Sequence, residues 1–235
     1  MNRPPTPARS PDGEEGGKFD GSMEPRPSSR RPGAVSLPLG AVILGAGTSS
    51  RMGRPKLLLP WHNTTVIGHL IGQWQALAAA QIAVVHRPND LALAAELDRL
   101  RFPRADRIEN PQPERGMFSS VVCAANWPGW NPGLSAWAIV LGDQPHLRPE
   151  TLRKLLEFHA PNPAAVCQPA FDGQPKHPVI LPPGAFCQLR TSQAGSLKEF
   201  LKQIPCPSVQ YSADDPGLLL DMDTPEDYKR ALQSP

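Results

Sequence analysis

The stretch AVILGAGTSSRMGRPK, residues 41–56, decides the fold class of this 235-residue chain. It opens with four apolar side chains, of which Val42 and Ile43 are β-branched, and such a run is typical of a buried strand. A glycine-rich turn follows. Apolar residues then recur at helical spacing, at Val66, Ile67, Leu70, Ile71, Trp74 and Leu77. This order of strand, loop and helix is the repeating unit of α/β proteins.

The alternation of strands and helices continues along the chain. Apolar runs predict strands at residues 82–85, around Ile108 and at residues 137–141. Helices are predicted at residues 91–100, 121–127 and 151–159, with Asp90 capping the first, Ser119 or Ser120 capping the second, and Pro149 opening the third. Strands that are apolar on both faces indicate a mostly parallel sheet covered by helices on both sides. We therefore predict an α/β fold, a Rossmann-like three-layer α/β/α arrangement.

The last third of the chain is less regular, because proline and glycine become more frequent there. Its apolar runs predict short strands at residues 179–181 and 209–211. In open parallel sheets, ligands bind beyond the carboxyl ends of the strands. The loops after Leu44, Ile108 and Leu141 are therefore expected to form the binding site, and the irregular part is expected to carry a second substrate.

The amino-terminal segment differs in composition from the rest. Residues 1–37 are dense in Pro, Arg, Ser, Gly and Glu, and they have too few large apolar side chains to offset the entropy of an unfolded chain. We predict a disordered tail there, and Met23 inside it is an alternative start. Residues 38–235 are long enough for one domain with a single core.

Charge and cysteine content exclude several classes of protein. The net charge of +2, from 24 basic and 22 acidic residues, is too balanced for a nucleic-acid binder. The four cysteines have no metal-site spacing and fit reduced thiols. No apolar run reaches the roughly 20 residues that span a bilayer, and the start of the chain is polar. We expect a cytoplasmic protein that binds neither nucleic acid nor membrane.

The glycine-rich loop indicates that the protein binds phosphate. Glycine lets backbone N–H groups approach phosphate oxygens, so we expect residues 44–47 (Leu44, Gly45, Ala46 and Gly47) to contact a nucleotide. Arg51 and Lys56 supply the cations that a triphosphate needs.

Two other phosphate-binding folds fit this loop less well. A dinucleotide-binding fold, as in an NAD-dependent oxidoreductase, would have a third glycine where Ser50 stands and an acidic residue after the second strand. A Walker loop would have Ser or Thr after its lysine, whereas Leu57 follows Lys56.

A carboxylate follows the predicted central strand. In Gly142-Asp143-Gln144-Pro145, Asp143 is well placed to ligate Mg²⁺, which prefers carboxylate oxygens shared with substrate phosphates. The alternative is an Asx turn before the proline.

The loop at residues 44–56 resembles the signature loop of the MobA-like nucleotidyltransferases, and the resemblance continues at Asp143 and extends over residues 40 to about 232. It implies the nucleotide-diphospho-sugar transferase type of fold. It also implies that Asp223 is the second metal ligand, with Asp221 as the alternative. Thr224 is predicted to cap the last helix as well.

Two further segments resemble the same family. Residues 115–120, with the sequence RGMFSS, resemble a segment of the cytidylyltransferase branch, which implies that Ser119 contacts the nucleotide. Lys176-His177-Pro178 resembles the family's element near the acceptor, and the resemblance implies acceptor-binding roles for Gln144, Pro145 and His177.

The resemblance implies a reaction as well as a fold. A nucleoside monophosphate moves from an NTP to the terminal phosphate of molybdopterin, pyrophosphate leaves, and Mg²⁺, Arg51, Lys56 and Asp143 carry the catalysis. Ala46 favours CTP over GTP, whereas Gly45 and Lys176 depart from the cytidine pattern. Residues 193–196, QAGS, lack the Asp that the family often has there, which leaves the acceptor open.

Several alternatives stay open. They are a molybdopterin guanylyltransferase, a sugar- or polyol-phosphate nucleotidyltransferase, and a non-catalytic chaperone for the molybdenum cofactor. A recipient molybdoenzyme is the expected protein partner if the acceptor is molybdopterin.

Overall fold

The structure is a computed structural model in which residues 38–234 and Met1 are described. The predicted tail therefore lies outside the described residues, apart from Met1. The strands are β1 (Leu39–Leu44), β2 (Pro60–Trp61), β3 (Thr64–Thr65), β4 (Gln81–His86), β5 (Arg107–Glu109), β6 (Ala136–Leu141), β7 (Val166–Phe171), β8 (Gln174–Pro175), β9 (Val179–Leu181) and β10 (Ser208–Ser212). The α-helices are α1 (Val66–Ala76), α2 (Leu91–Arg99), α3 (Met117–Asn126), α4 (Pro149–His159), α5 (Pro183–Gln188), α6 (Leu197–Gln203) and α7 (Pro225–Leu232). The 3-10 helices are η1 (Lys56–Leu58), η2 (Arg104–Asp106), η3 (Pro113–Arg115), η4 (Leu189–Thr191) and η5 (Pro216–Leu219).

The main sheet has the strand order β10-β7-β9-β6-β1-β4-β5, with β8 paired to β7. Strands β5, β4, β1 and β6 run parallel to one another, and β10 runs parallel to β7. Strand β9 is antiparallel to both β6 and β7. The prediction of a mostly parallel sheet is therefore confirmed, with one reversed strand inside it.

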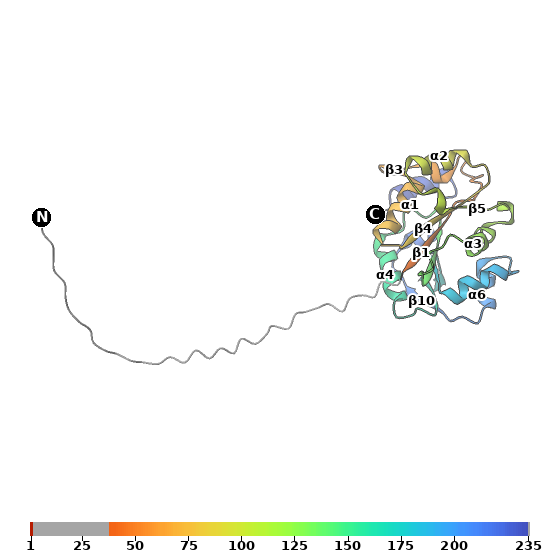
Figure 1. Cartoon of the computed structure of the whole chain (residues 1–235). Helices are drawn as coiled ribbons and strands as arrows, with labels where there is room; N and C mark the ends of the chain where they lie inside the picture. Colours follow the sequence, from red (N-terminus) through yellow and green to blue (C-terminus); the bar gives the residue numbers. More distant parts are fainter. Residues whose placement is uncertain (2–37, 235) are drawn as a thin grey trace. The chain divides into compact units, whose positions relative to one another are not determined.

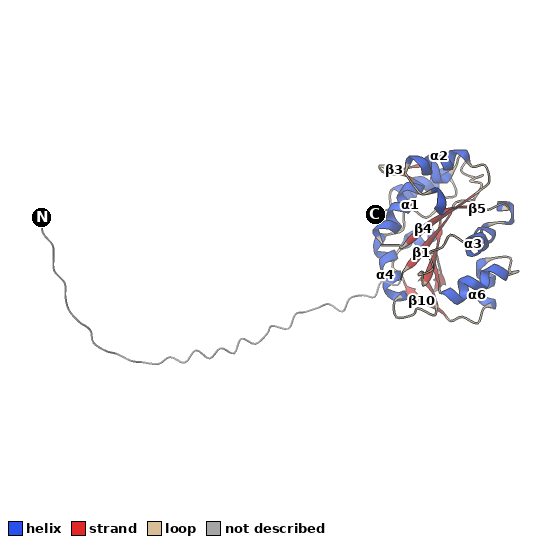
Figure 2. Ribbon diagram, in the orientation of Figure 1, coloured by secondary structure: helices blue, strands red, loops and turns tan. Residues whose placement is uncertain are grey.

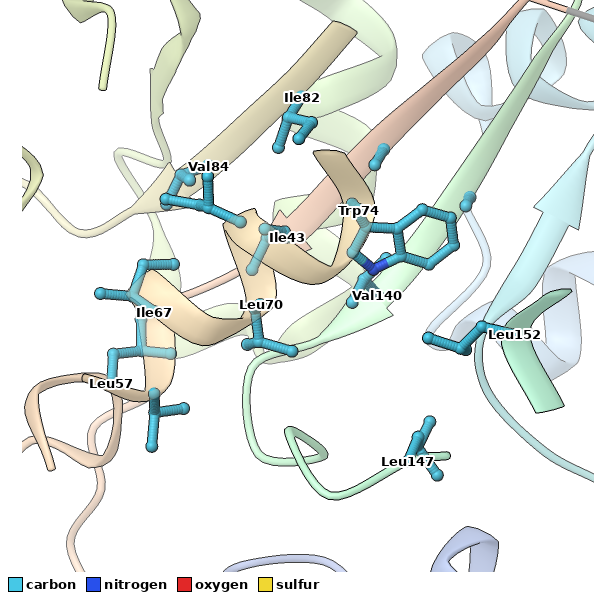
Figure 3. Close-up of a cluster of buried hydrophobic side chains, with 14 of the residues drawn as sticks. Ile43, Leu57, Ile67, Leu70, Trp74, Ile82, Val84, Val140, Leu147 and Leu152 are labelled. Atoms are coloured by element: carbon cyan, nitrogen blue, oxygen red, sulfur yellow. The ribbon is translucent and has the colours of Figure 1, made fainter. Parts of the chain in front are cut away.

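Helices cover both faces of the sheet, as Figures 1 and 2 show. Alternate residues of β1 belong to opposite cores, because successive side chains of a strand point to opposite faces. Ala41 and Ile43 join the core beneath α1, α2, α4 and α7, part of which Figure 3 shows around Trp74 and Leu70. Val42 joins the other core, beneath α3, α5 and α6. The three-layer α/β/α prediction is confirmed.

Local sequence signals set the ends of most helices. Asp90 caps α2 by accepting a hydrogen bond from Leu93 N, and Pro149 is the first residue of α4, as predicted. Thr224 caps α7 in a capping box with Asp227, which is also as predicted.

The predicted start of α3 is wrong. The helix begins at Met117, and its N-cap is Gly116, which makes no side-chain cap and has a φ of 85°. Glycine adopts this backbone conformation without the steric cost that a side chain brings, so the chain turns into the helix there. Ser119 and Ser120 consequently lie inside the first turn of the helix.

The reversal of β9 brings a distant segment to the binding edge of the sheet. Val179 pairs with Ile139 and Leu181 pairs with Trp137, so β9 begins near the carboxyl end of β6. His177 and Pro178, just before β9, therefore lie at the edge where the parallel strands end.

Among the residues that the structure describes, none belongs to a helix with the length and apolar character needed to cross a membrane.

Candidate active site

A cavity of about 570 Å³ lies at the carboxyl edge of the central strands. Four segments line it, namely the loop after β1, the start of α3 with η3 before it, the loop after β6, and the segment before α7. The lining residues are Leu44, Gly45, Ala46, Gly47, Thr48, Ser49, Arg51, Lys56, Leu57, Pro113, Glu114, Gly116, Met117, Ser120, Leu141, Gly142, Asp143, Asp221 and Asp223. This is the edge at which the sequence predicts ligand binding.

Two glycines, one just after β1 and one just after β6, lie tightly against their neighbours. A Cβ on Gly45 would lie 2.7 Å from Leu57 Cδ1 and 3.0 Å from Val85 O. A Cβ on Gly142 would lie 2.6 Å from the backbone oxygen of Leu44. The loop after β1 can therefore lie this close to β4, and the loop after β6 this close to the end of β1, only because Gly45 and Gly142 lack a side chain.

Lys56 lies at the centre of the cationic part of the cavity. Its backbone N donates to Ser49 Oγ over 3.1 Å, which ties the loop to the start of η1. Its Nζ lies 2.6 Å from Asp223 Oδ1 and 3.5 Å from Asp143 Oδ2. One ammonium group thus joins the two carboxylates that were predicted to hold the metal.

Arg51 binds the same acidic group from the solvent side. Its guanidinium Nη2 lies 2.7 Å from Asp223 Oδ2, so both oxygens of that carboxylate are paired with cations. The Arg51 side chain is 69% exposed, whereas that of Lys56 is 14% exposed. The two cations therefore differ in their freedom to move, because Lys56 is packed in the wall and Arg51 is not.

Burial raises the pKa of Asp143 above 3.8, the ordinary value for an aspartate. The opposing effect of Lys56 is the next in size, and repulsion from Asp221 and Asp223 raises the pKa further. Three carboxylates therefore lie close together in the site, and a nearby cation stabilises their ionised forms.

Hydrogen bonds hold the two acidic loops together. Met222 N donates to Asp143 O over 3.1 Å, and Gln144 Nε2 donates to Asp221 Oδ1 over 2.9 Å. These contacts keep the loop after β6 next to the segment before α7.

A buried carboxylate anchors the same pair of segments further from the cavity. Asp215 is 1% exposed and accepts hydrogen bonds from Thr151 Oγ1 over 2.7 Å and from Arg148 N over 3.2 Å. His146 Nε2 lies 3.0 Å from Gly217 O. The positions of Asp143 and Asp223 thus depend on contacts well away from them.

The donor set fits a hard divalent cation such as Mg²⁺. Asp143 and Asp223 offer carboxylate oxygens, and Lys56 Nζ already lies between them where positive charge is needed. In the described part of the chain, no three His, Cys, Asp or Glu side chains are placed to hold an ion together. Mg²⁺ usually takes one or two carboxylates from a protein and completes its shell with water and substrate phosphates.

The wall opposite the cations is built around a buried asparagine. Asn110 is fully buried, and its Nδ2 donates to Ser119 Oγ over 2.8 Å and to Ser120 Oγ over 3.0 Å. Its Oδ1 accepts from Gln112 N over 2.9 Å. Asn110 therefore fixes the start of α3 against the segment before it.

Ser119, predicted to contact the nucleotide, does not line the cavity. Its hydroxyl donates to the backbone oxygens of Gln112 and Gly116, and the neighbouring Ser120 lines the cavity. The sequence reasoning also missed Glu114 and Met117, which line the same wall. Their position in the sequence could have identified them, because they lie just before and at the start of a helix that follows a strand.

The three residues predicted to bind the acceptor lie beside this cavity and not in its lining. Gln144 is 5% exposed and is bonded to Asp221. Pro145 is buried next to it. His177 Nδ1 lies 3.5 Å from Ile139 O, and burial lowers the pKa of the ring. Acceptor binding by these residues stays a prediction.

Comparisons with known proteins agree with this geometry. A family model described as the MobA-like NTP transferase domain matches residues 41–209. The molybdenum cofactor cytidylyltransferase of Escherichia coli (strain K12) is 27% identical over 200 residues, which cover 82% of this chain and 94% of that protein.

Solved structures share the fold. The crystal structure of Rv0371c from Mycobacterium tuberculosis H37Rv is similar with a TM-score of 0.63 and 25% identity, over 85% of this chain and 99% of that one. A structure described as Rv0371C in complex with manganese gives a TM-score of 0.60 and 22% identity, over 85% and 100%.

The family model covers well over half of the chain, and its match includes the glycine-rich loop, Lys56 and Asp143. The protein therefore belongs to the MobA-like NTP transferase family and is a nucleotidyltransferase related to molybdenum cofactor cytidylyltransferase.

Proposed function

We propose that this protein is a Mg²⁺-dependent cytidylyltransferase that transfers CMP from CTP to the terminal phosphate of molybdopterin, with release of pyrophosphate. The observation that carries the proposal is the meeting of Lys56 with Asp143 and Asp223 at the edge of a glycine-rich loop. The relationship to a molybdenum cofactor cytidylyltransferase supports the choice of acceptor, and Ala46 supports the choice of CTP.

In this proposal the chemistry is a displacement at phosphorus. An oxygen of the acceptor's phosphate forms a bond to the α-phosphorus of CTP, and the bond from that phosphorus to the bridging oxygen of the β-phosphate breaks. The second pKa of a phosphate monoester is about 6, so the nucleophile is already anionic near neutral pH and needs no general base. The electron pair of the broken bond leaves on pyrophosphate.

The residues of the chain contribute position and charge. Backbone N–H groups of the loop at residues 44–47 face the phosphates, and Arg51 and Lys56 neutralise charge on the transferred and leaving groups. Such preorganised charges stabilise the transition state because they need no rearrangement when the reaction occurs. Residues Asp143 and Asp223 would hold Mg²⁺, which supplies a Lewis acid for the phosphate oxygens when bound.

The proposal extends to the setting of the enzyme. Residues 38–235 form the nucleotidyltransferase domain, the enzyme acts in the cytoplasm, and a molybdoenzyme receives the product. The manganese in a related structure supports a divalent ion in general, and Mg²⁺ is our choice because the donors are carboxylates.

The test is pyrophosphate release with Mg²⁺, with CTP and GTP in parallel, each with and without molybdenum-loaded molybdopterin. We expect release with CTP that requires the acceptor and is lost in Asp143→Ala. Release with GTP alone would reassign the protein as a guanylyltransferase. If neither nucleotide reacts, phosphorylated sugars and polyols are tested as acceptors. Tight binding of molybdopterin without turnover of any nucleotide would favour a chaperone.

A further inference from the structure

The two carboxylates predicted to hold the metal are paired with cations of the chain. Asp223 has Lys56 on one oxygen and Arg51 on the other, at 2.6 and 2.7 Å. Asp143 has Lys56 Nζ at 3.5 Å. A divalent ion that binds these oxygens must therefore displace at least the ammonium group of Lys56.

The chain supplies few further ligands that would favour binding of the ion over binding of Lys56. The third carboxylate that lines the cavity, Asp221, already accepts a hydrogen bond from Gln144 Nε2 over 2.9 Å. Two carboxylates alone make a weak site for Mg²⁺, whose remaining ligands are normally water and substrate phosphates. Displacement of Lys56 therefore has to be driven by something other than the metal.

A triphosphate can provide the free energy that displaces Lys56, because it attracts the same two cations. Lys56 and Arg51 line the cavity together with the glycine-rich loop where phosphates are expected. The backbone of Lys56 is held by Ser49, so only the end of its side chain needs to move. Arg51 is largely exposed and can turn toward a ligand without disturbing the core.

We propose that Lys56 acts as an internal counter-ion that occupies the metal carboxylates of the free protein, so that the divalent ion binds tightly only when a nucleoside triphosphate has drawn Lys56 and Arg51 away. The inference deepens the proposed function and rests on it. Because linkage between two ligands is reciprocal, bound metal also frees both cations for the triphosphate.

The first experiment measures metal binding without any nucleotide. Binding of Mn²⁺ alone is followed by electron paramagnetic resonance in the full chain and in Lys56→Met, which removes the charge and keeps similar bulk. We expect Lys56→Met to bind Mn²⁺ tighter by about tenfold or more, since charges this close at a partly exposed site interact at least that strongly. Lys56→Arg keeps the cation and should bind Mn²⁺ as weakly as the unmodified protein.

A matched control separates this effect from a general change of charge. Lys154, on the exposed side of α4 and without an ion pair among the described residues, is replaced by Met in the same way. Lys154→Met should leave Mn²⁺ affinity unchanged. If folded Lys56→Met binds Mn²⁺ no tighter than the unmodified protein, the inference is overturned.

The second experiment adds a CTP analogue with an α,β-methylene bridge and follows Mn²⁺ by the relaxation of water protons, which distinguishes protein-bound ion from the ion bound to analogue alone. In the unmodified protein the analogue should raise Mn²⁺ affinity strongly, and in Lys56→Met the rise should be smaller. An equal rise in both proteins overturns the inference and leaves the proposed function standing. Failure of the unmodified protein to take up Mn²⁺ with the analogue overturns both.

Discussion

At the scale of single residues, the ionised form of Asp143 lowers the stability of the folded protein. Burial and two neighbouring carboxylates raise the pKa of Asp143, which means that the ionised form is disfavoured in the folded state. Lys56 compensates this in part, but Lys56 also pairs with Asp223. The ionised form of Asp143 therefore does not add to the stability of the folded protein.

We predict that Asp143→Asn makes the protein more stable and inactive. The folded state holds a proton on Asp143 more tightly than the unfolded state does. Ionised Asp143 therefore lowers the free energy of unfolding at pH values above the raised pKa, and this loss disappears as pH falls toward 3.8. The gain in unfolding free energy should therefore be largest near neutral pH and shrink in acid. Turnover should fall by about a hundredfold or more, as when one charge-stabilising group is lost.

Urea unfolding of both proteins at several pH values between neutral and mildly acidic checks the stability, and pyrophosphate release checks the activity. Asp172→Asn, at an exposed position in the turn between β7 and β8, serves as the control and should show no comparable gain. A less stable Asp143→Asn protein at neutral pH would contradict the prediction.

The motifs predicted that Lys56, Asp143 and Asp223 belong to one site, and all three line the cavity. The direct contact of Lys56 with the two carboxylates was not predictable. Lys56 is separated from Asp143 by 87 residues and from Asp223 by 167 residues. No sequence period encodes a contact over such a distance, and only the folded sheet brings the loops together. For the same reason the sequence did not reveal that Gln144 is bonded to Asp221.

At the scale of secondary-structure elements, α7 and Asp223 are coupled through the cap of the helix. Thr224 directly follows Asp223, and its side chain accepts a hydrogen bond from Asp227 N. Hydrogen bonds from Thr224 and Arg230 lower the pKa of Asp227 to about 2, so the capping carboxylate stays ionised in mild acid. The start of this helix therefore also fixes the backbone next to Asp223.

We predict that Thr224→Ala lowers the free energy of unfolding by about 1 kcal/mol, the usual cost of losing an N-cap. Thr224→Ser keeps the hydroxyl and should cost much less. Urea unfolding curves give both values. The alanine variant should also release pyrophosphate more slowly, because Asp223 is less well held. Equal stability of the alanine and serine variants would show that the cap contributes nothing.

The ends of helices were predictable where side chains make the cap, and not where the backbone does. Asp90 and Thr224 cap their helices as their residue types indicate. The start of α3 depends instead on Gly116 and its positive φ. The sequence suggested Ser119 or Ser120 as the cap because serine is a common N-cap residue. The direction of β9 was likewise not predictable, because a short apolar run has the same pattern in either direction.

At the scale of the whole molecule, the core of the described part of the chain extends from Leu39 to Ala231. Strand β1 lies at the centre of the sheet between β4 and β6, and its side chains at Ala41, Val42 and Ile43 are fully buried. The fold class was predictable because strands that are apolar on both faces and alternate with helices have few other solutions.

We predict that deletion of residues 2–33 leaves the unfolding midpoint and pyrophosphate release unchanged. That segment has few large apolar side chains, Phe19 and Met23 among them, so we expect the domain to lose no core packing by its removal. Deletion of residues 2–44 removes β1 and should abolish folding. Circular dichroism and thermal unfolding of the two truncated chains check the result, and a loss of activity in the shorter deletion would assign a role to the tail.

The reversed strand has a consequence for how this enzyme can diversify. The segment between β7 and β9 turns back on itself through β8 and delivers His177 beside the end of β6. The nucleotide loop comes from β1, on the other side of β6. In the proposed assignment, the acceptor binds on the side of this hairpin and the triphosphate on the side of the β1 loop. Insertions in the hairpin would then change the acceptor site while the triphosphate site keeps its shape, so that the two substrates could be exchanged independently during evolution.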